Sequence, residues 1–577
     1  MLYRYILFFI GFQFSFLPML AQEQVPIATS HFNIDLSNRI ILINEDLETL
    51  NTTFPGSKTS IRVDDKAFVF DDPIVILEKG VPYEVKDEWN SPFHLYFSEL
   101  PIINIQTPNT ILDDPRVYAQ FCLVESNGLM IKQGVGIEIR GGSSQSLPKK
   151  SFRIEFWKDT LGIEKEDVSI LGMRNDDDWN LDALAFEPLR LRSKIGYELW
   201  RKMDTLYYQD IEPNAINGIR QEFIELFLNG SYHGVYSISE RVDRKQLKLQ
   251  KKETNQLRGE LYKGIAWGGS TFTNLPGYSN NSKLWGGFKF EYPMDTIEWS
   301  MIYNFVDFLI NSDTVYFYEN YQSQFAIDNA VNYFIFLNLL NALDNTGKNI
   351  FIGRYDQAEP YFYIPWDLNG SFGLAWNGNI EVSNNDILSN GFYDRLIRED
   401  SPGGFLEKLV AKWTLLRNQV ITTDAILESF NTQFDYLKCN GVYERESIVW
   451  ENFNFQGEND LLFLENWLTQ RISFLDEIFY NPELITSISP EEKEEQKIKI
   501  FPNPAKEAIS WSIQNNDCPI EKILLIDSKG NKISDQSLFS IQNKFYVGDL
   551  QPGLYFVHIE FCDGSRKVER LVVKREG

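Results

Sequence analysis

Histidine is scarce in this chain, and the few histidines that occur are far apart. Among 577 residues there are four, namely His31, His94, His233 and His558. A zinc hydrolase needs histidines gathered around its metal, and a Ser-His-Asp hydrolase needs one between its nucleophile and its acid. The scattered positions match neither arrangement. The sequence therefore disfavours both classes of hydrolase.

Cysteine is equally scarce, and its spacing matches no zinc-binding motif. The four cysteines are Cys122, Cys439, Cys518 and Cys562. In an exported protein two or more of them can pair. Cys518 and Cys562 lie in one C-terminal segment, so a disulfide between them fits the sequence without being required by it.

Long apolar runs are absent after the first 21 residues. The opening segment, MLYRYILFFIGFQFSFLPMLA, has a positive start at Arg4, an apolar stretch from Ile6 to Leu17, and small residues before Gln22. The apolar stretch is short of the ~20 residues that a spanning helix needs, and no basic stop signal follows it. We predict a signal peptide over 1–21, with a membrane anchor as the alternative, and no integral membrane span after its removal.

Positive charge is in deficit, with 55 Lys and Arg against 81 Asp and Glu and a formal net charge of −26. The phosphates of nucleic acids and of anionic lipids repel such a chain. We therefore expect no nucleic-acid partner, whereas the surplus of carboxylates suits divalent cations. Hydrophobic residues make up 43% of the chain, which is enough for a sizeable core.

Apolar periodicity and turn residues divide the rest of the chain into four segments. Runs such as RIILI and AFVF, separated by turns, predict a β-rich accessory segment over 22–98. Residues 99–484 are predicted to form a mixed α+β domain. Residues 485–497 are predicted to be a charged linker, and residues 498–577 a small β-sandwich of short strands.

Several local patterns in the α+β domain predict individual elements. They are a long amphipathic helix over 186–203, a hairpin that turns at Asn229-Gly230, a helix over 325–343, the strand pair IFIGRY and YFYIPW, and a largely helical segment over 405–480. The helix over 325–343 carries Asp328 in its first turn, where the helix dipole favours an acid. This helix leads into the stretch NALDNTGKNI.

Asp344 and Asn349 are five residues apart in NALDNTGKNI, and Asp367 follows in IPWDLNGSFG. Protein kinases use this order, with an Asp for the substrate hydroxyl, an Asn for one metal ion, and a further metal-binding Asp after a strand–turn unit. The spacing alone is weak, because no His-Arg precedes Asp344 and no G-x-G-x-x-G loop stands where a phosphate-covering loop belongs. A turn that Asp, Asn and Gly form for local reasons is the alternative.

Six stretches in series resemble the spore-coat-protein-H-like (CotH) kinase family, a group of atypical secreted protein kinases. They are RGGSSQSLPKKSFRIEF, LRLRSKIGYEL, LFLNGSYHGVYSISERVD, GELYKG, NALDNTGKNIFIGRYD and YIPWDLNGSFG. The resemblance covers about residues 99–480. It implies an α+β fold whose divergent protein-kinase-like domain is flanked by the N-terminal β segment and the C-terminal β-sandwich. It also implies transfer of the ATP γ-phosphoryl group to Ser or Thr hydroxyls of a protein substrate.

The resemblance implies roles for the residues of the two acidic loops. Asp344 would be catalytic, accepting or orienting the proton of the substrate hydroxyl. Asn349 and Asp367 would bind Mg²⁺ or Mn²⁺, hard ions that prefer oxygen ligands.

The resemblance also implies a set of residues that bind ATP. Lys149 or Lys150 would hold the phosphates, and strand alternation lets only one of them face inward without deciding which. Glu187, in the predicted helix, would orient that lysine. The further candidates are Arg140 with the Gly141–Ser146 loop over the phosphates, Glu240 at a hinge beside the adenine, and Asp243 near the ribose. Each also has a simpler interpretation, as a solvated helix acid, a polar residue after a strand or a plain hairpin loop.

The chain departs from the family pattern at three positions. Family members often carry Asp where Asn369 stands, and an Asp and an Asn where Glu187 and Ser193 stand. Asp367 itself is retained, so one metal-binding carboxylate is present. The alternative function is therefore a catalytically inactive surface or structural binding protein, a pseudokinase of the same fold.

The C-terminal segment has a resemblance of its own. IFPNPAKEAISW, LLIDSKGNKI, LQPGLYFVHI and VERLVVKR resemble the type IX secretion sorting domain of Bacteroidetes, over about residues 498–577. This resemblance implies passage through the periplasm, recognition by the outer-membrane secretion machinery, and a secreted or cell-surface product. A β-sandwich adhesion module is the alternative.

Overall fold

The computed structural model divides the chain into two compact units, Met1–Thr486 and Ser487–Gly577. It describes residues 22–254, 256–266, 272–380, 384–399, 401–451, 453–488, 498–513, 520–527, 532–537, 544–561 and 566–574. The predicted signal peptide lies outside the described residues, as do positions 489–497 of the predicted linker and the cysteines Cys518 and Cys562. No helix within the described ranges is both long enough and apolar enough to cross a membrane.

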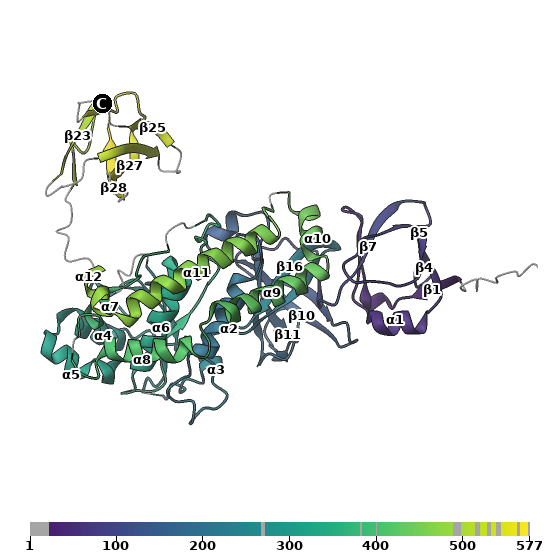
Figure 1. Ribbon diagram of the computed structural model, residues 1–577, viewed down its shortest axis with the longest axis horizontal. Coiled ribbons are helices and arrows are strands. Elements are labelled where there is room, and N and C mark those ends of the chain that lie inside the picture. Colours follow the sequence, from purple (N-terminus) through teal and green to yellow (C-terminus); the bar gives the residue numbers. More distant parts are fainter. Residues whose placement is uncertain are drawn as a thin grey trace, which may run out of the picture. The chain divides into compact units, whose positions relative to one another are not determined.

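The N-terminal part of the first unit is a sheet of seven strands, where the sequence predicts a β-rich segment (Figure 1). Its strand order is β1-β4-β5-β6-β7-β3-β2, and it buries a core of its own that includes Val25 and Phe68. Helix α1 (Leu47–Thr53) begins after Asp46, whose side chain accepts the N–H of Glu48. The strands are β1 (Gln22–Pro26), β2 (Phe32–Asp35), β3 (Ile40–Ile43), β4 (Ser57–Val63), β5 (Lys66–Ile74), β6 (Tyr83–Lys86) and β7 (Pro92–Phe97).

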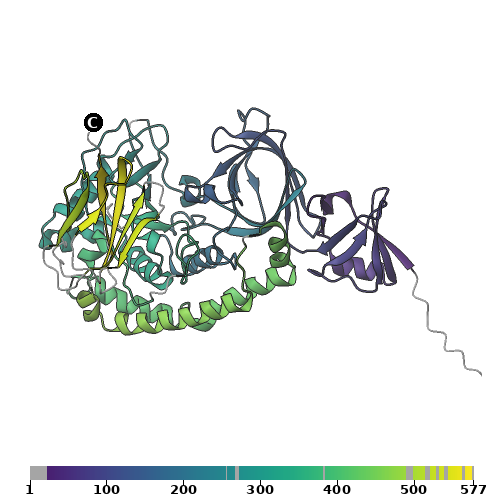
Figure 2. The ribbon, with the colours of Figure 1, turned by 90° about the horizontal axis from the view of Figure 1, so that it is seen from above.

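The next strands close into a barrel, which Figure 2 shows as a ring. The order around it is β10-β11-β14-β16-β15-β8-β9, and Phe121, Ile154 and Trp179 are among the residues that fill it. The predicted hairpin turn is confirmed, since Asn229 and Gly230 have φ angles of 51° and 79° between two paired strands. The strands are β8 (Ile102–Gln106), β9 (Val117–Val124), β10 (Met130–Arg140), β11 (Ser151–Trp157), β14 (Asp178–Asp182), β15 (Gln221–Leu228) and β16 (Ser231–Ser239), with β12 (Val168–Ser169) and β13 (Asn175–Asp176) in a small separate sheet.

The helix after β14 is shorter than the sequence predicts. It is α2 (Arg192–Met203), so the prediction of a helix from residue 186 is wrong in its first part. Glu187 precedes Pro188, and a residue before proline is disfavoured in the helical conformation. Arg190 has a φ angle of 63°, in the left-handed region. The segment before α2 therefore forms turns, and Glu187 lies outside the helix.

A five-stranded sheet and most of the helices complete the first unit. The strand order is β18-β19-β17-β20-β21. Helix α6 (Ile327–Leu340) confirms the helix predicted over 325–343, and it ends at Asn341 in the left-handed conformation that commonly closes a helix. Helices α6, α8 and α11 pack on one another around the largest core cluster (Figure 1).

These elements have the following bounds. The strands are β17 (Glu260–Ile265), β18 (Leu284–Trp285), β19 (Phe288–Tyr292), β20 (Lys348–Arg354) and β21 (Tyr361–Pro365). The helices are α3 (Arg244–Leu247), α4 (Ser300–Asn311), α5 (Thr314–Gln324), α7 (Gly391–Leu396), α8 (Phe405–Arg417), α9 (Thr423–Cys439), α10 (Val442–Val449), α11 (Glu458–Tyr480) and α12 (Glu483–Ile488). Short 3₁₀ helices are η1 (Thr29–His31), η2 (Ser143–Ser146) and η4 (Leu343–Asn345).

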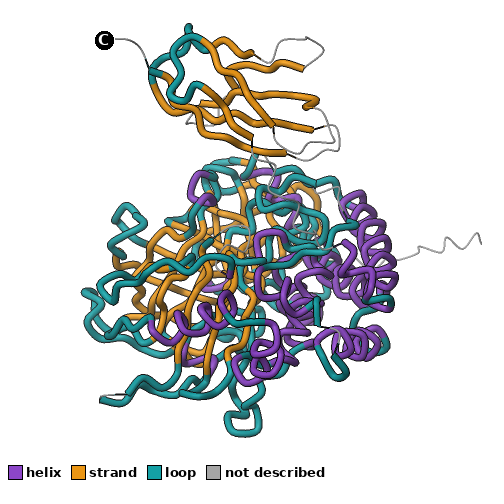
Figure 3. Tube along the Cα trace, turned by 90° about the vertical axis from the view of Figure 1, so that its left-hand side faces the viewer, coloured by secondary structure: helices purple, strands orange, loops and turns teal. Residues whose placement is uncertain are grey.

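The second unit consists of short strands, as the sequence predicts (Figure 3). They form two sheets, of order β22-β23-β26 and β25-β24-β27-β28. Trp511, Leu525 and Val557 belong to one buried cluster that both sheets share. The strands are β22 (Ile498–Phe501), β23 (Ala508–Ile513), β24 (Ile520–Asp527), β25 (Lys532–Ser537), β26 (Lys544–Tyr546), β27 (Gly553–Phe561) and β28 (Arg566–Val573).

Candidate functional site

A cavity of about 640 Å³ is lined both by the barrel and by the five-stranded sheet. The barrel contributes the ends of β10 and β14 and the start of β11, and the sheet contributes β17, β19, β20 and the loop after β21. Asp344, Asn349 and Asp367 all line it. The structure therefore brings together the three residues of the two acidic loops.

Asp344 lies in the 3₁₀ turn η4, directly after helix α6. The hydroxyl of Tyr333, on that helix, donates to the carbonyl of Asn345 at 2.8 Å and fixes the turn. Asp344 is 9% exposed, and burial raises its pKa to about 6, with Lys348 opposing the shift and Asp367 adding to it. A carboxylate with a pKa near neutrality is suited to take a proton from a hydroxyl group.

Asn349 and Asp367 are brought together by the pairing of β20 with β21. Ile350 is opposite Pro365 in this antiparallel pair, and the N–H of Trp366 donates to the Asn349 carbonyl at 3.0 Å. Asn349 and Asp367 have φ angles of 56° and 54°, a left-handed conformation that is uncommon for residues other than glycine. Asn and Asp tolerate this conformation better than other residues with a side chain, so both positions suit the residues that occupy them.

Asn345 ties the two loops to each other. Its side-chain N–H₂ donates to the carbonyl of Asn349 at 2.9 Å and to the carbonyl of Trp366 at 2.8 Å. The hydroxyl of Tyr197, on α2, accepts the N–H of Asp367 at 2.9 Å. The positions of Asn349 and Asp367 thus depend on helix α2 and on the loop that carries Asp344.

Arg140 lines the cavity, as the resemblance implies for a residue near the phosphates. Its guanidinium is paired with Asp182 on β14 and lies 5.7 Å from the centre of the Trp366 ring. Burial raises the pKa of Asp182, while Arg140 and the Ser239 hydroxyl, which donates at 3.1 Å, oppose this shift. The Arg140 charge is therefore already matched by a carboxylate.

Of the two predicted lysines, Lys149 lines the cavity and Lys150 is not among the residues that line it. The Lys149 ammonium donates to a carboxylate oxygen of Glu446 at 2.7 Å and to the carbonyl of Val235 at 2.6 Å. Burial lowers the Lys149 pKa to about 7, although Glu446 opposes the shift. Lys150 donates to the carbonyl of Gln145 at 2.5 Å. A phosphate-binding role for either lysine stays a prediction.

Glu187 organises the start of helix α2. Its carboxylate accepts the N–H groups of Leu189 and Arg192 at 3.0 and 3.1 Å, and it pairs with the Arg192 guanidinium at 2.6 Å. It is fully buried and is not among the residues that line the cavity. Among the described residues its partners are those of its own turn, so the predicted contact with a phosphate-binding lysine is not formed.

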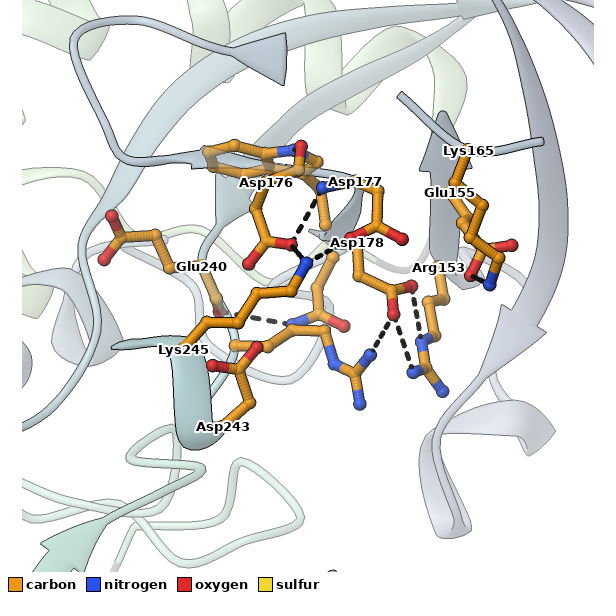
Figure 4. Close-up of polar contacts among 12 residues, drawn as sticks. Arg153, Glu155, Lys165, Asp176, Asp177, Asp178, Glu240, Asp243 and Lys245 are labelled. Atoms are coloured by element: carbon orange, nitrogen blue, oxygen red, sulfur yellow. Dashed lines mark hydrogen bonds and ion pairs between the residues drawn. The ribbon is translucent and has the colours of Figure 1, made fainter. Parts of the chain in front are cut away.

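Glu240 and Asp243 lie beside a network of charged residues (Figure 4). The buried Glu240 accepts the N–H groups of Arg174 and Arg220 at 3.1 and 2.9 Å. Asp243 pairs with the Arg174 guanidinium at 2.7 Å and caps helix α3 through the N–H of Gln246 at 2.8 Å. Neither is among the residues that line the cavity. Their predicted roles toward adenine and ribose stay predictions.

Two groups of carboxylates in this network are close enough to share a metal ion, namely Glu155 with Asp177 and Asp178, and Asp167 with Asp176 and Asp177. Each group has basic partners. Lys245 pairs with Asp176 at 2.7 Å and with Asp177 at 2.5 Å, and Figure 4 shows both contacts. Arg241 pairs with Asp178 at 2.6 Å. Because ammonium and guanidinium groups already neutralise these acids, they serve as an ion-pair network.

Asn349 and Asp367 fit a metal ion of the magnesium class. An amide oxygen and a carboxylate are hard donors, and Mg²⁺ in proteins commonly takes one or two carboxylates, several waters and phosphate oxygens of the substrate. This donor set suits an ion that is held jointly with a nucleotide. Asn369 donates an N–H to Asp367 at 3.2 Å, at the position where a further carboxylate would add a ligand.

Several residues that line the cavity or hold it together were not predicted from the sequence. Lys263 and Asp182 line it, Tyr197 holds Asp367, and Asn345 joins the loops. A signal existed for Lys263, because it stands in the stretch GELYKG. Asp182 and Asn345 had no distinguishing spacing, since their partners are distant in sequence.

A known protein family matches the part of the chain that contains most of the cavity. A family model described as CotH kinase protein matches residues 137–475, which is more than half of the chain. A second model, described as a secretion system C-terminal sorting domain, matches residues 499–574. No curated protein matches the chain. The first match includes every predicted site residue, from Arg140 to Asp367.

Proposed function

Because the chain belongs to the CotH kinase protein family, we propose that it is an exported atypical protein kinase. In this proposal it transfers the γ-phosphoryl group of ATP to Ser or Thr hydroxyls of a protein, with Mg²⁺ or Mn²⁺ as cofactor. Residues 99–484 then adopt a divergent protein-kinase-like fold. The C-terminal strands form a β-sandwich, which is supported by the buried cluster that their two sheets share.

Export itself follows from the second family match. The chain carries a secretion system C-terminal sorting domain over residues 499–574. It is therefore a client of the type IX secretion machinery and reaches the cell surface or the surroundings of the cell.

One observation carries the kinase proposal, namely that Asp344, Asn349 and Asp367 line a single cavity although they come from two separate stretches of the chain. Phosphoryl transfer needs positioned charge and a positioned hydroxyl more than it needs covalent chemistry. When bound, the metal ion would neutralise charge on the transferring phosphoryl group. Asn349 and Asp367 would hold that ion, and Asp344 would orient the acceptor hydroxyl and take its proton.

The burial of Asp344 supports this division of roles. A carboxyl group with an ordinary pKa is a weak base, whereas burial raises the pKa of Asp344 to about 6. Arg140 and Asp182 line the barrel side of the same cavity. A ligand in the cavity thus meets the Asp344 and Asp367 carboxylates together with lysines of the sheet, and an ion pair at the barrel.

Phosphoryl transfer tests the proposal directly. We expect the purified exported chain to label itself or a protein acceptor from γ-labelled ATP with Mn²⁺, and Asp344→Ala to lower the labelling rate by about 100-fold or more, as for loss of a general base. The matched control is Asp210→Ala, at an exposed turn, which should leave the rate unchanged. Absence of labelling, or labelling that Asp344→Ala does not alter, would contradict a kinase.

A pseudokinase is the second candidate, and Asn369 is the observation that favours it. The side chain of Asn369 offers Asp367 a hydrogen-bond donor in place of a second carboxylate. A pseudokinase would bind ATP with a divalent ion, yet would transfer no label to any acceptor. The labelling experiment and a measurement of ATP binding therefore separate the two candidates.

A further inference from the structure

Lys263 occupies a fixed place in the wall of the cavity. It lies on β17, where Lys289 of β19 is its partner on one side and Phe351 of β20 on the other. Its neighbour Tyr262 is fully buried against Trp299, on the opposite face of the strand. Strand alternation therefore places the Lys263 side chain toward the cavity, which it lines.

The Lys263 ammonium differs from the other cations of the cavity wall. Arg140 pairs with Asp182, Lys149 with Glu446, Lys289 with Glu291, and Arg153 and Arg241 with Asp178. Lys348 acts on the Asp344 carboxylate. Within the described ranges of the chain, Lys263 makes no hydrogen bond and no ion pair.

The Lys263 ammonium is surrounded by aromatic rings, which attract its charge but accept no ordinary hydrogen bond from it. The ammonium lies 5.7 Å from the ring centre of Phe351 and 5.6 Å from that of Trp366, the ring that Arg140 approaches from 5.7 Å. Aromatic faces attract a cation, but they replace only part of the water that burial removes. Burial accordingly lowers the Lys263 pKa, although Asp367 acts in the opposite direction.

We infer that Lys263 binds the phosphate oxygens of the nucleotide in this cavity. The inference rests on the proposed function and deepens it, because neither the family match nor the spacing assigns this lysine a role. An ammonium with unused donors, beside the metal-binding Asp367, is placed to neutralise a polyanion held jointly with a metal ion. Lys149 has the same charge, but its donors are committed to Glu446 and to a main-chain carbonyl.

Calorimetric titration of the purified exported chain with ATP and Mn²⁺ tests the inference. We expect Lys263→Met to weaken ATP binding by about tenfold or more, since a charge-assisted hydrogen bond to phosphate is lost. The matched control is Lys79→Met, a lysine that is paired with Glu99 and is not among the residues that line the cavity, and it should bind ATP as the unaltered chain does. Adenosine, which lacks phosphates, should bind both variants and the unaltered chain equally.

Two further measurements keep the outcomes distinct. Lys263→Arg keeps the charge and should retain most of the affinity for ATP. If Lys263→Met does not fold, the affinity of Lys263→Arg is compared with that of the unaltered chain instead. Inorganic tripolyphosphate is a second probe that needs no adenine site. If the unaltered chain binds tripolyphosphate but not ATP, the proposal of a nucleotide site fails. If Lys263→Met then weakens the binding of tripolyphosphate, an anion site at Lys263 is still supported.

The inference is overturned if Lys263→Met binds ATP or tripolyphosphate within twofold of the unaltered chain. It is also overturned if the unaltered chain binds neither polyphosphate, because an unpaired ammonium would then have no anionic ligand. Equal losses for ATP and adenosine would likewise count against it, since they would indicate a collapsed cavity in place of a lost phosphate contact.

Discussion

At the scale of single residues, Asp204 is a buried carboxylate that is hydrogen-bonded by neutral polar side chains. Three asparagine side chains donate N–H groups to it, Asn217 at 2.6 Å, Asn332 at 2.9 Å and Asn329 at 3.1 Å. Asn217 and Asn329 also donate to the carbonyl of Tyr363, on β21. Asp204 therefore connects the end of α2 to α6 and to the strand that leads to Asp367.

Asp204 should make the stability of the fold depend on pH. Burial raises its pKa from 3.8 to about 6, although the three asparagines oppose the shift. Between these values the folded state keeps a proton that the unfolded state has released, so the free energy of unfolding falls as the pH rises from about 4 to about 6. The loss is roughly 3 kcal/mol, because each pKa unit corresponds to about 1.4 kcal/mol.

Urea unfolding of the unaltered chain and of Asp204→Asn at pH 4 and pH 7 measures this effect. The variant does not titrate at this position, so the difference in free energy of unfolding between the two chains should change by roughly 3 kcal/mol across the range. Asp210→Asn, at an exposed position, is the control and should follow the unaltered chain. If the free energies of unfolding of the unaltered chain and of Asp204→Asn change with pH in parallel, the pKa of Asp204 is not raised in the folded state.

The candidate site was predictable at this scale where its residues are close in sequence. Asp344, in the turn η4, and Asn349, near the start of β20, are five residues apart, and Asp367 follows one strand pair later. This spacing, together with the resemblance of the surrounding stretches to the CotH family, predicted one site. Lys263 and Asp182 come from strands whose neighbours are distant in sequence, and their place in the cavity depends on tertiary contacts. For Glu187 the local signal was misleading, because a helical pattern of apolar residues continued past Pro188.

At the scale of elements, helix α10 holds the barrel from outside. Its residue Glu446 pairs with Lys149 at 2.7 Å and with Arg190 at 2.9 Å, and it accepts the N–H of Val235 on β16 at 2.7 Å. Gly234 has a φ angle of 88°, and a Cβ atom there would stand 1.9 Å from a Glu446 carboxylate oxygen. The carboxylate can reach β16 because this position is glycine.

Removal of the Lys149 side chain should therefore destabilise the protein. Lys149→Met leaves the fully buried Glu446 with one cation in place of two, and we expect a loss of about 3 kcal/mol in the free energy of unfolding. Lys150→Met is the matched control, since Lys150 donates only to a main-chain carbonyl, and its cost should stay below about 1 kcal/mol. Guanidinium unfolding of both variants measures the difference. Equal losses would contradict a structural role specific to Lys149.

Elements with strong local signals were predicted well, and the arrangement of strands was not. The helix over 325–343 and the turn at Asn229-Gly230 have periodicity and turn residues of their own. Closure of the barrel depends on the parallel pairing of β8 with β15, which joins Ile102 to Glu225. No local pattern encodes a contact over such a sequence separation, so the sequence predicted strands here without predicting a barrel.

At the scale of the whole molecule, the chain separates into two units with distinct buried cores. The first unit contains the cavity and the second contains the sorting domain. Each unit buries its own apolar residues, so each should unfold as a cooperative transition of its own.

Deletion of residues 487–577 should separate folding from export. In scanning calorimetry we expect the full chain to show two transitions, and the shortened chain to keep the transition of the first unit at an unchanged temperature. In the cell the shortened chain should accumulate in the periplasm, because the type IX machinery no longer recognises it. A single cooperative transition for the full chain, or unimpaired export of the shortened chain, would be incompatible with two independent units.

The central claim is that the cavity bounded by Asp344, Asn349 and Asp367 binds a metal ion together with ATP. The most direct test is a crystal structure of the exported chain with Mn²⁺ and a non-hydrolysable ATP analogue, with the metal located by its anomalous scattering. The account predicts an Mn²⁺ peak in contact with the Asn349 amide oxygen and the Asp367 carboxylate, with phosphate oxygens completing its coordination. A peak at the Asp176–Asp178 network alone, or a nucleotide bound outside the cavity, would contradict it.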